Sequence, residues 1–116
     1  MLSEAEKYLG YPYVWGGSSP ATSFDCSGFV SWVINHSGWN VGRLGAQGLY
    51  NICTRTSSPR PGDLVFFKGT YDTPGVSHVG IYVGDGMMIH CGDPISYANL
   101  NTSYWQSHFY AYGRLP

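Results

Sequence analysis

One cysteine stands where a thiol could act as a nucleophile. Cys26 lies within Asp25-Cys26-Ser27-Gly28-Phe29, where a polar, glycine-rich loop is expected to turn into an amphipathic helix. The backbone N–H groups of a helix's first turn have no partner inside the helix and carry partial positive charge, so they favour thiolate over thiol. The sequence therefore predicts a reactive Cys26 whose thiol pKa lies below the usual value of about 8.5.

A thiol nucleophile also needs a base that takes its proton and a third polar group that orients the base. His78 and His90 occupy the two arms of a predicted hairpin whose turn is Gly84-Asp85-Gly86. If all three turn residues form the loop, Gly80 pairs with His90, and the histidines share one face as diagonal neighbours about 7 to 8 Å apart. If only the last two form the turn, a one-residue slip sends His90 to the opposite face. A catalytic pair therefore requires the three-residue loop, and Gly80 would leave room for an imidazole or a substrate against the sheet.

Metal binding is the competing interpretation of these side chains. Zinc accepts cysteine, histidine and carboxylate ligands, and the candidates are Cys26, His78, His90, Cys91 and Asp93. No Cys-x-x-Cys or His-x-x-x-His spacing is present, and strand alternation sends Cys91 away from His90. We therefore expect neither a metal site nor another cofactor.

The remaining cysteines and histidines are expected to be structural. Three cysteines cannot all pair with one another, and Cys53 and Cys91 are predicted to be small buried hydrophobes rather than a disulfide. His36 falls near a helix C-terminus, where a cation is mildly favourable without any catalytic role. His108 is expected to be an ordinary residue at a strand edge.

Helices early in the chain and strands later in it must position these groups. Ser3-Glu4-Ala5-Glu6 reads as a capping box that opens a short helix ended by Gly10. A loop follows from Tyr11 to Asp25, and apolar residues at helical spacing predict a helix from Cys26 to Gly38. A third helix over Ala46 to Cys53 is interrupted by glycines. Apolar runs predict strands over Asp63 to Phe67, Ser77 to Val83, Met87 to Cys91 and Phe109 to Arg114. This order predicts an α+β domain with an antiparallel sheet.

Length and composition restrict the partners. The 116 residues suffice for one domain, spanning 1–116, with a single hydrophobic core. Lys and Arg number 6 and Asp and Glu 7, a net charge of −1 without a basic block, so nucleic acid and anionic lipid are not expected partners. No apolar run approaches the roughly 20 residues of a membrane span. With 11% charged and 16% aromatic residues, the surface suits an uncharged or sugar-containing ligand.

Four motifs follow one another along nearly the whole chain, from Leu2 to Leu115. They are Gly10-Tyr11-Pro12-Tyr13-Val14-Trp15-Gly16-Gly17, Asp25-Cys26-Ser27-Gly28-Phe29, Arg60-Pro61-Gly62-Asp63-Leu64-Val65-Phe66-Phe67 and Ser77-His78-Val79-Gly80-Ile81-Tyr82-Val83-Gly84. Together they resemble the NlpC/P60 family of cell-wall cysteine peptidases. The resemblance implies a papain-like α+β fold, with the nucleophile at a helix N-terminus packed against a central antiparallel sheet.

The resemblance also implies catalytic roles for particular residues. Cys26 matches the nucleophile, His78 the general base, and His90 the polar group that orients His78. Tyr13 is similar to the tyrosine that helps to hold the oxyanion, together with the backbone N–H of Cys26. Because the third polar position varies within the family, His90 fits this role without being diagnostic of it.

Substrate-binding roles are implied for Asp25, Ser27 and Tyr13. Asp25 and Ser27 resemble residues that bind a free amino terminus in family members acting on trimmed stem peptides. Asp25 could equally be a helix cap, since aspartate is favoured there without any substrate, and Tyr13 could be plain core. Trp15 is expected to contribute only packing.

The implied substrate is the stem peptide of bacterial peptidoglycan, cut between γ-D-glutamate and either diaminopimelate or lysine through a thioester acyl-enzyme. A thiol acyltransferase or amidase on the same scaffold stays open as an alternative, as does a wall-binding module without catalysis. A role in the cell wall implies an extracellular location, although the chain shows no secretion signal. We expect a monomeric domain attached to another wall-acting domain of a longer hydrolase.

Overall fold

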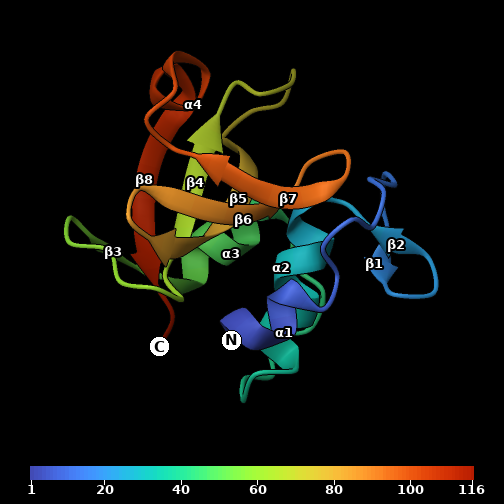
Figure 1. Cartoon of the computed structure of the whole chain (residues 1–116). Helices are drawn as coiled ribbons and strands as arrows, with labels where there is room; N and C mark the ends of the chain where they lie inside the picture. Colours follow the sequence, from blue (N-terminus) through green and yellow to red (C-terminus); the bar gives the residue numbers. More distant parts are fainter.

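The polypeptide folds around an antiparallel sheet that carries the first three helices on one face and, on the other, a smaller apolar layer to which the last helix contributes (Figure 1). The computed structural model describes residues 1–116. Six strands of the sheet run in the order β3-β8-β4-β5-β6-β7, and β1 and β2 form a separate pair. In chain order the elements are α1 (Leu2–Glu6), β1 (Ser18–Ser19), β2 (Ser23–Phe24), α2 (Cys26–Asn35), α3 (Ala46–Ile52), β3 (Thr54–Thr56), β4 (Leu64–Lys68), β5 (Val76–Gly84), β6 (Met87–Cys91), β7 (Ile95–Asn99), α4 (Ser103–His108) and β8 (Phe109–Arg114). The α+β fold predicted from the sequence is confirmed.

The central strand β4 is apolar because both of its faces are covered. It lies between β8 and β5, and its first four residues are fully buried. Leu64 and Phe66 belong to the main core, which lies between the sheet and the helices. Val65 and Phe67 point to the opposite face, where they meet Met88 in a smaller cluster. This alternation explains why the segment reads as a continuous apolar run instead of an alternating one.

Helix α2 begins at Cys26 because the preceding residue caps it. Asp25 has an extended backbone, and its Oδ1 accepts a 2.7 Å hydrogen bond from the N–H of Gly28. Phe29 and Val33, on the buried side of the helix, are completely inaccessible and pack in the main core. Both the predicted helix and its aspartate cap are therefore present.

The first helix begins differently from the prediction. The capping box at Ser3 does not form, because α1 already begins at Leu2, and Met1 holds the cap position without a side-chain hydrogen bond. The side chain of Glu4 instead accepts hydrogen bonds from Lys7 and Tyr8. The glycine-interrupted helix predicted over Ala46 to Cys53 does form, as α3.

The β5-β6 hairpin closes in a way that the sequence did not predict. Asp85 and Gly86 both have positive φ, 54° and 72°, and form a two-residue turn between Gly84 and Met87, so the predicted three-residue loop is wrong. A β-bulge between Tyr82 and Gly84 supplies the missing residue inside the strand. The register beyond it, with Ile81 opposite Ile89, is the one that the three-residue loop would have produced. One face of the hairpin therefore still carries both histidines.

Five elements lie outside the predicted set, among them the short pair of β1 and β2 within the segment 11–25 that was expected to be a loop. Strands β3 and β7 form the two edges of the sheet, and α4 precedes the last strand. β7 pairs along the whole of β6, so the strand that carries His90 is an interior strand. α4 supplies Trp105, which contacts both histidines of the hairpin.

All three cysteines are free, so the predicted absence of a disulfide is confirmed. Cys91 is 1% exposed and packs in the main core, whereas Cys53 is only partly buried. None of the helices combines the length and the apolar character that crossing a membrane requires.

Candidate active site

The thiol of Cys26 lies at the junction between the first turn of α2 and the start of β5. Its side chain is 7% exposed, and its Sγ is 3.9 Å from the backbone oxygen of Ser77. Ser77 directly precedes His78, so this contact places the thiol next to the backbone of the candidate base. Helix α2 packs on β5 and β6, the two strands of the histidine hairpin.

Burial raises the pKa of Cys26, and the nearby charge of Asp25 raises it further. Backbone groups of Val79 and Ser27 and the charge of Arg43 act in the opposite direction without reversing the shift. The predicted thiol pKa below the usual value is therefore wrong for the free protein. A helix N-terminus contributes at most about 2 kcal/mol, whereas desolvation of a buried group can move a pKa by several units. The thiol is protonated at neutral pH and needs a base.

His78 and His90 form a hydrogen-bonded pair on the hairpin. Nε2 of His78 and Nδ1 of His90 lie 2.9 Å apart. Between the two strands, Gly80 makes this approach possible, because a Cβ there would lie 3.2 Å from the Cβ of His90 and 2.6 Å from the Sδ of Met88. Any other residue at position 80 would therefore displace its neighbours on β6, as the sequence indicated.

Both imidazoles are neutral at physiological pH. Burial lowers the pKa of His78 to about 3, with His90 as a smaller cause, and burial lowers the pKa of His90 to about 4. If His78 is to accept a proton from Cys26, the nitrogen available is Nδ1, because Nε2 is engaged with His90. Nε2 must then carry the hydrogen and donate it to Nδ1 of His90. The hydrogen bond thus selects the tautomer that leaves a free acceptor for the thiol.

An aromatic wall shields the two histidines from water. The ring of Trp105 stacks on His78 with 5.3 Å between ring centroids and meets His90 edge-on at 5.2 Å. Phe67 lies behind both, 5.9 Å from His78 and 4.7 Å from Trp105. These apolar neighbours provide the burial that keeps the imidazoles uncharged.

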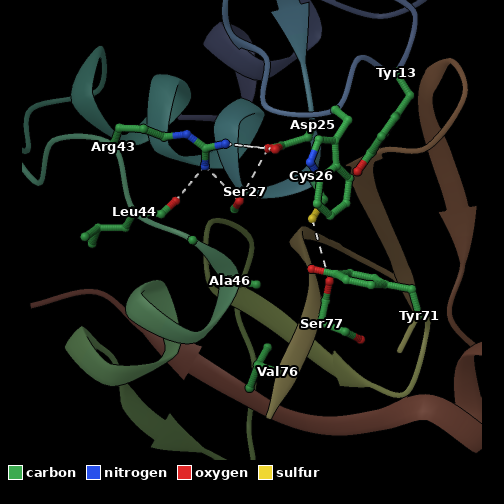
Figure 2. A pocket seen from close by; sticks show the side chains of 12 residues that line it. Tyr13, Asp25, Cys26, Ser27, Arg43, Leu44, Ala46, Tyr71, Val76 and Ser77 are labelled. Atoms are coloured by element: carbon green, nitrogen blue, oxygen red, sulfur yellow. Dashed lines mark hydrogen bonds and ion pairs between the residues drawn. The ribbon is translucent and has the colours of Figure 1, made fainter. Parts of the chain in front are cut away.

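Tyr13 lines two cavities, one that contains Cys26 and one that contains the two histidines. Burial, followed by the charges of Cys26 and Asp25, raises the pKa of Tyr13 to about 12, so its phenol keeps its proton and can donate. In Figure 2 its hydroxyl end points into the cavity toward Cys26. This is the arrangement expected of an oxyanion donor acting with the Cys26 N–H.

One hollow lies beside the thiol and the other beside the imidazoles. The cavity beside Cys26, of about 260 Å³, is lined by Tyr13, Trp15, Asp25, Cys26, Ser27, Arg43, Leu44, Gly45, Ala46, Tyr71, Val76 and Ser77. The cavity beside the histidines, of about 390 Å³, is lined by Tyr13, Thr70, Tyr71, His78, His90, Cys91, Gly92, Asp93, Tyr104 and Trp105. Tyr13 and Tyr71 belong to both, so the two cavities can hold the two sides of one extended ligand.

The carboxylate of Asp25 does more than cap α2. Nη2 of Arg43 lies 2.8 and 2.9 Å from its two oxygens, and Nη1 of Arg43 donates to Oγ of Ser27 at 2.8 Å (Figure 2). Asp25 and Ser27 thus line the cavity as predicted, but as members of an ion-pair network. Their role in binding an amino terminus stays a prediction.

Arg43, Tyr71 and Trp105 belong to the site but were absent from the residues predicted by the sequence. None follows a motif, and each reaches the site through the tertiary fold from a segment far from Cys26. The prediction that Trp15 only packs is wrong, because the side chain is 70% exposed and meets the ring of Tyr71 at 5.5 Å. No three histidine, cysteine, aspartate or glutamate side chains gather in a way that could hold a metal ion.

The comparisons with known proteins agree with this geometry. The model of the NlpC/P60 family matches residues 10–114. The chain belongs to this family. It is 44% identical over 118 residues to the bifunctional muramidase/DL-endopeptidase CwlT of Bacillus subtilis, covering 99% of this chain and 36% of CwlT. It is 39% identical over 120 residues to a gamma-DL-glutamyl hydrolase of the same organism, covering 92% of this chain and 27% of that protein.

A solved structure is similar over the same range. It belongs to a lipoprotein-like NLP/P60 family protein of Staphylococcus aureus and matches with a TM-score of 0.94 at 44% identity. The match covers 98% of this chain and 39% of that one. The NlpC/P60 fold predicted from the four motifs is therefore confirmed, and the chain spans between 27% and 39% of the length of these three proteins.

Proposed function

We propose that this domain is a cysteine endopeptidase that hydrolyses peptidoglycan stem peptides at the bond between γ-D-glutamate and a diamino acid. Two observations carry the proposal: the buried Cys26 thiol at the start of α2, whose Sγ contacts the backbone oxygen of the residue before His78, and the hydrogen-bonded pair of His78 and His90. The names of the relatives, a DL-endopeptidase and a gamma-DL-glutamyl hydrolase, support the choice of bond.

In the proposed reaction, acylation begins when His78 removes the proton of the thiol. The sulfur of Cys26 attacks the scissile carbonyl carbon, a C–S bond forms, and negative charge develops on the carbonyl oxygen. Tyr13 and the Cys26 N–H donate to that oxygen, each contributing roughly 2.7 to 4 kcal/mol by analogy with other oxyanion holes. The C–N bond then breaks, and the imidazolium of His78 returns its proton to the leaving amine.

Deacylation completes the cycle with the same groups. His78, neutral again, takes a proton from a water molecule that attacks the thioester carbonyl. The C–S bond breaks, Cys26 recovers the proton, and a free carboxylate is released. Because a neutral His90 accepts from His78 without carrying negative charge, it orients the base more than it stabilises the imidazolium.

The experiment compares the natural domain with a Cys26→Ala variant on purified muropeptides, with product masses measured. The wild type should release two fragments whose summed mass exceeds that of the substrate by one water, and Cys26→Ala should release none. Cys53→Ala, which removes a thiol outside both cavities, should cleave normally. Undiminished cleavage by Cys26→Ala would end the proposal, and amine conjugates in place of free acids would assign an acyltransferase instead.

We further propose an extracellular role at the cell wall, as part of a larger wall-acting protein. Support comes from the curated relatives, of which this chain covers 36% and 27%. Fractionation of the producing cells, followed by detection of the domain in the wall fraction, tests this location.

A further inference from the structure

The cavity beside Cys26 ends at a closed ion pair. Arg43 uses Nη2 for both carboxylate oxygens of Asp25 and Nη1 for Oγ of Ser27 and the backbone oxygen of Leu44, each contact being 2.8 or 2.9 Å (Figure 2). Each terminal nitrogen of the guanidinium has two hydrogens, and both of them have protein acceptors. The guanidinium is therefore held firmly in place, although its side chain is 37% exposed.

The carboxylate of Asp25 has no free capacity in this arrangement. Besides Arg43, its Oδ1 accepts from the N–H of Gly28 at 2.7 Å and from Oγ of Ser27 at 3.4 Å. Its Oδ2 accepts from the N–H of Gly16 at 3.0 Å. A carboxylate offers about four acceptor sites, and here they are taken by the protein itself.

The direction of the reaction decides which end of a substrate meets this ion pair. His78 must return a proton to the leaving amine, so the leaving part of the peptide lies in the cavity that His78 and Trp105 line. The acyl part, which ends at the amino group of the stem, then extends from Cys26 into the cavity that Asp25 and Arg43 line. In a stem cut after its second residue, that amino group is two residues from the thiol.

An ammonium group at this position would find a cation and no available anion. To reach Asp25 it would have to displace Arg43 from a bidentate contact, and otherwise it would face the guanidinium directly. Like charges that meet in a partly buried site are a strong source of discrimination. A neutral amide at the same place would avoid both costs.

We propose that Arg43 is a specificity residue that makes this site prefer stem peptides whose first amino group is acylated, as it is while the stem remains attached to the glycan. The inference rests on the proposed function and deepens it. In this chain Arg43 occupies the carboxylate that would otherwise bind a free amino terminus, and Ser27 is committed to the same network.

The test uses two peptides that differ only at the amino group, one a free-amine stem tripeptide and the other its N-acetyl derivative. For the natural domain, kcat/KM should be higher for the acetylated peptide by about tenfold or more. A preference for the free amine would overturn the inference while leaving the peptidase proposal intact. If neither peptide, nor an intact muropeptide, is cleaved, the proposed function itself fails.

A variant then assigns the preference to Arg43. Arg43→Gln removes the charge and frees Asp25, and should shift the ratio of the two kcat/KM values toward the free amine by about tenfold. Arg43→Lys keeps the cation and should hold the ratio near that of the natural domain. Arg55→Gln removes one positive charge from β3, outside the cavity, and should leave the ratio unchanged.

Circular dichroism of each variant verifies its fold before the ratios are compared. An unchanged ratio in a folded Arg43→Gln protein overturns the role given to Arg43. If that variant does not fold, the comparison of the two peptides on the natural domain still decides the preference, and Arg43→Lys decides whether it depends on the cation.

Discussion

Nε2 of His78 lies 2.9 Å from Nδ1 of His90, and this contact leaves Nδ1 as the nitrogen of His78 that is free to accept a proton. Both rings are neutral, so the contact works by fixing a tautomer and a ring orientation instead of by supplying charge. Cys26 is protonated for the same reason that the histidines are not, namely burial. The resting site is therefore a thiol and an imidazole, and charge separation accompanies the attack on substrate.

Replacement of His90 should affect kcat according to whether an acceptor remains. In His90→Asn the amide oxygen can take the hydrogen bond from His78, and we expect a loss of about tenfold or less. In His90→Leu the acceptor is gone and His78 can adopt the unproductive tautomer, so kcat should fall by about 10² to 10⁴. Hydrolysis of the acetylated stem peptide measures both, with His36→Asn as a control on an exposed histidine. Equal losses in the Asn and Leu variants would contradict the orienting role.

Trp105→Ala should move the acid limb of the pH profile. The indole stacks on His78 and is part of the burial that lowers its pKa to about 3, so removing it should raise that pKa toward 6.5. Besides Trp105, the groups in contact with His78 are the apolar Phe67 and the neutral His90, and the carboxyl side chain of Asp93 lines the same cavity. Wild-type kcat/KM should be flat from pH 7 to 5, whereas the variant should decline across that range.

Trp105→Phe keeps an aromatic face over the imidazole and should restore much of the flat profile. If the alanine variant loses activity equally at every pH, Trp105 serves only packing.

Gly80→Ala should disturb the hydrogen bond between the histidines without touching either ring. The new methyl group would lie 2.6 Å from the Sδ of Met88 and 3.2 Å from the Cβ of His90. Overpacking of this kind costs about 1 to 3 kcal/mol of folding free energy, and we expect kcat to fall by about tenfold. Gly48→Ala, in helix α3 where no atom lies nearer than 3.4 Å, is the matched control and should be neutral or stabilising. Urea unfolding and hydrolysis rates are measured for both glycine variants. Normal activity in Gly80→Ala would contradict the close approach of His90 and Met88 to position 80.

Acid should destabilise the fold between pH 6.5 and 4.5. His78 and His90 titrate near 6.5 when unfolded but at about 3 and 4 when folded, so in this window the unfolded chain binds more protons. Stability is complete above pH 6.5 and declines as the pH falls, by up to about 1.4 kcal/mol per pH unit for each histidine. Asp63 and Glu4, whose pKa values are lowered by their cationic neighbours, act only below this window.

Urea unfolding at a series of pH values measures this slope. The double variant His78→Gln/His90→Asn should show no decline in stability between pH 6.5 and 4.5, but it should still lose stability below pH 4. A wild-type protein that is equally stable at pH 6.5 and 4.5 would contradict the neutral state of the pair.

The elements that local pattern determines could be predicted, and those that depend on tertiary partners could not. Helix α2 has its cap at Asp25 and its apolar stripe within one segment, and β4 is a single apolar run, so both were predicted. Strand β7 has only one fully buried residue, Ile95, and its pairing with β6 carries no local signal. Helix α4 has no buried residue at all, so no apolar periodicity predicts it.

The residues of the candidate site also divide into those that local sequence predicts and those that depend on tertiary contacts. Cys26, His78 and His90 could be predicted from motif and hairpin geometry; the structure pairs the two histidines and places the Sγ of Cys26 against the backbone oxygen of Ser77, next to His78 in the chain. The ion pair of Arg43 with Asp25 depends on how the loop before α3 returns to α2, and the local sequence of neither the loop nor the helix predicts this contact. The pKa of Cys26 was predicted in the wrong direction because the helix N-terminus is visible in the sequence, whereas burial by the sheet is not.

The bulge at Tyr82 to Gly84 fixes the alternation of the β6 side chains relative to those of β5, and the candidate active site depends on this alternation. The tip of the hairpin is exposed at Asp85, and exposed loop tips ordinarily tolerate a change of length. Here the bulge sets the pairing: if the same residues paired without it, Val83 would lie opposite Met88 and Ile81 opposite His90, and the alternation of the whole of β6 relative to β5 would be reversed. His90 would then enter the hydrophobic core, and Cys91 would take its place beside His78. The position of His90 at one end of the hairpin therefore depends on a backbone irregularity at the other end.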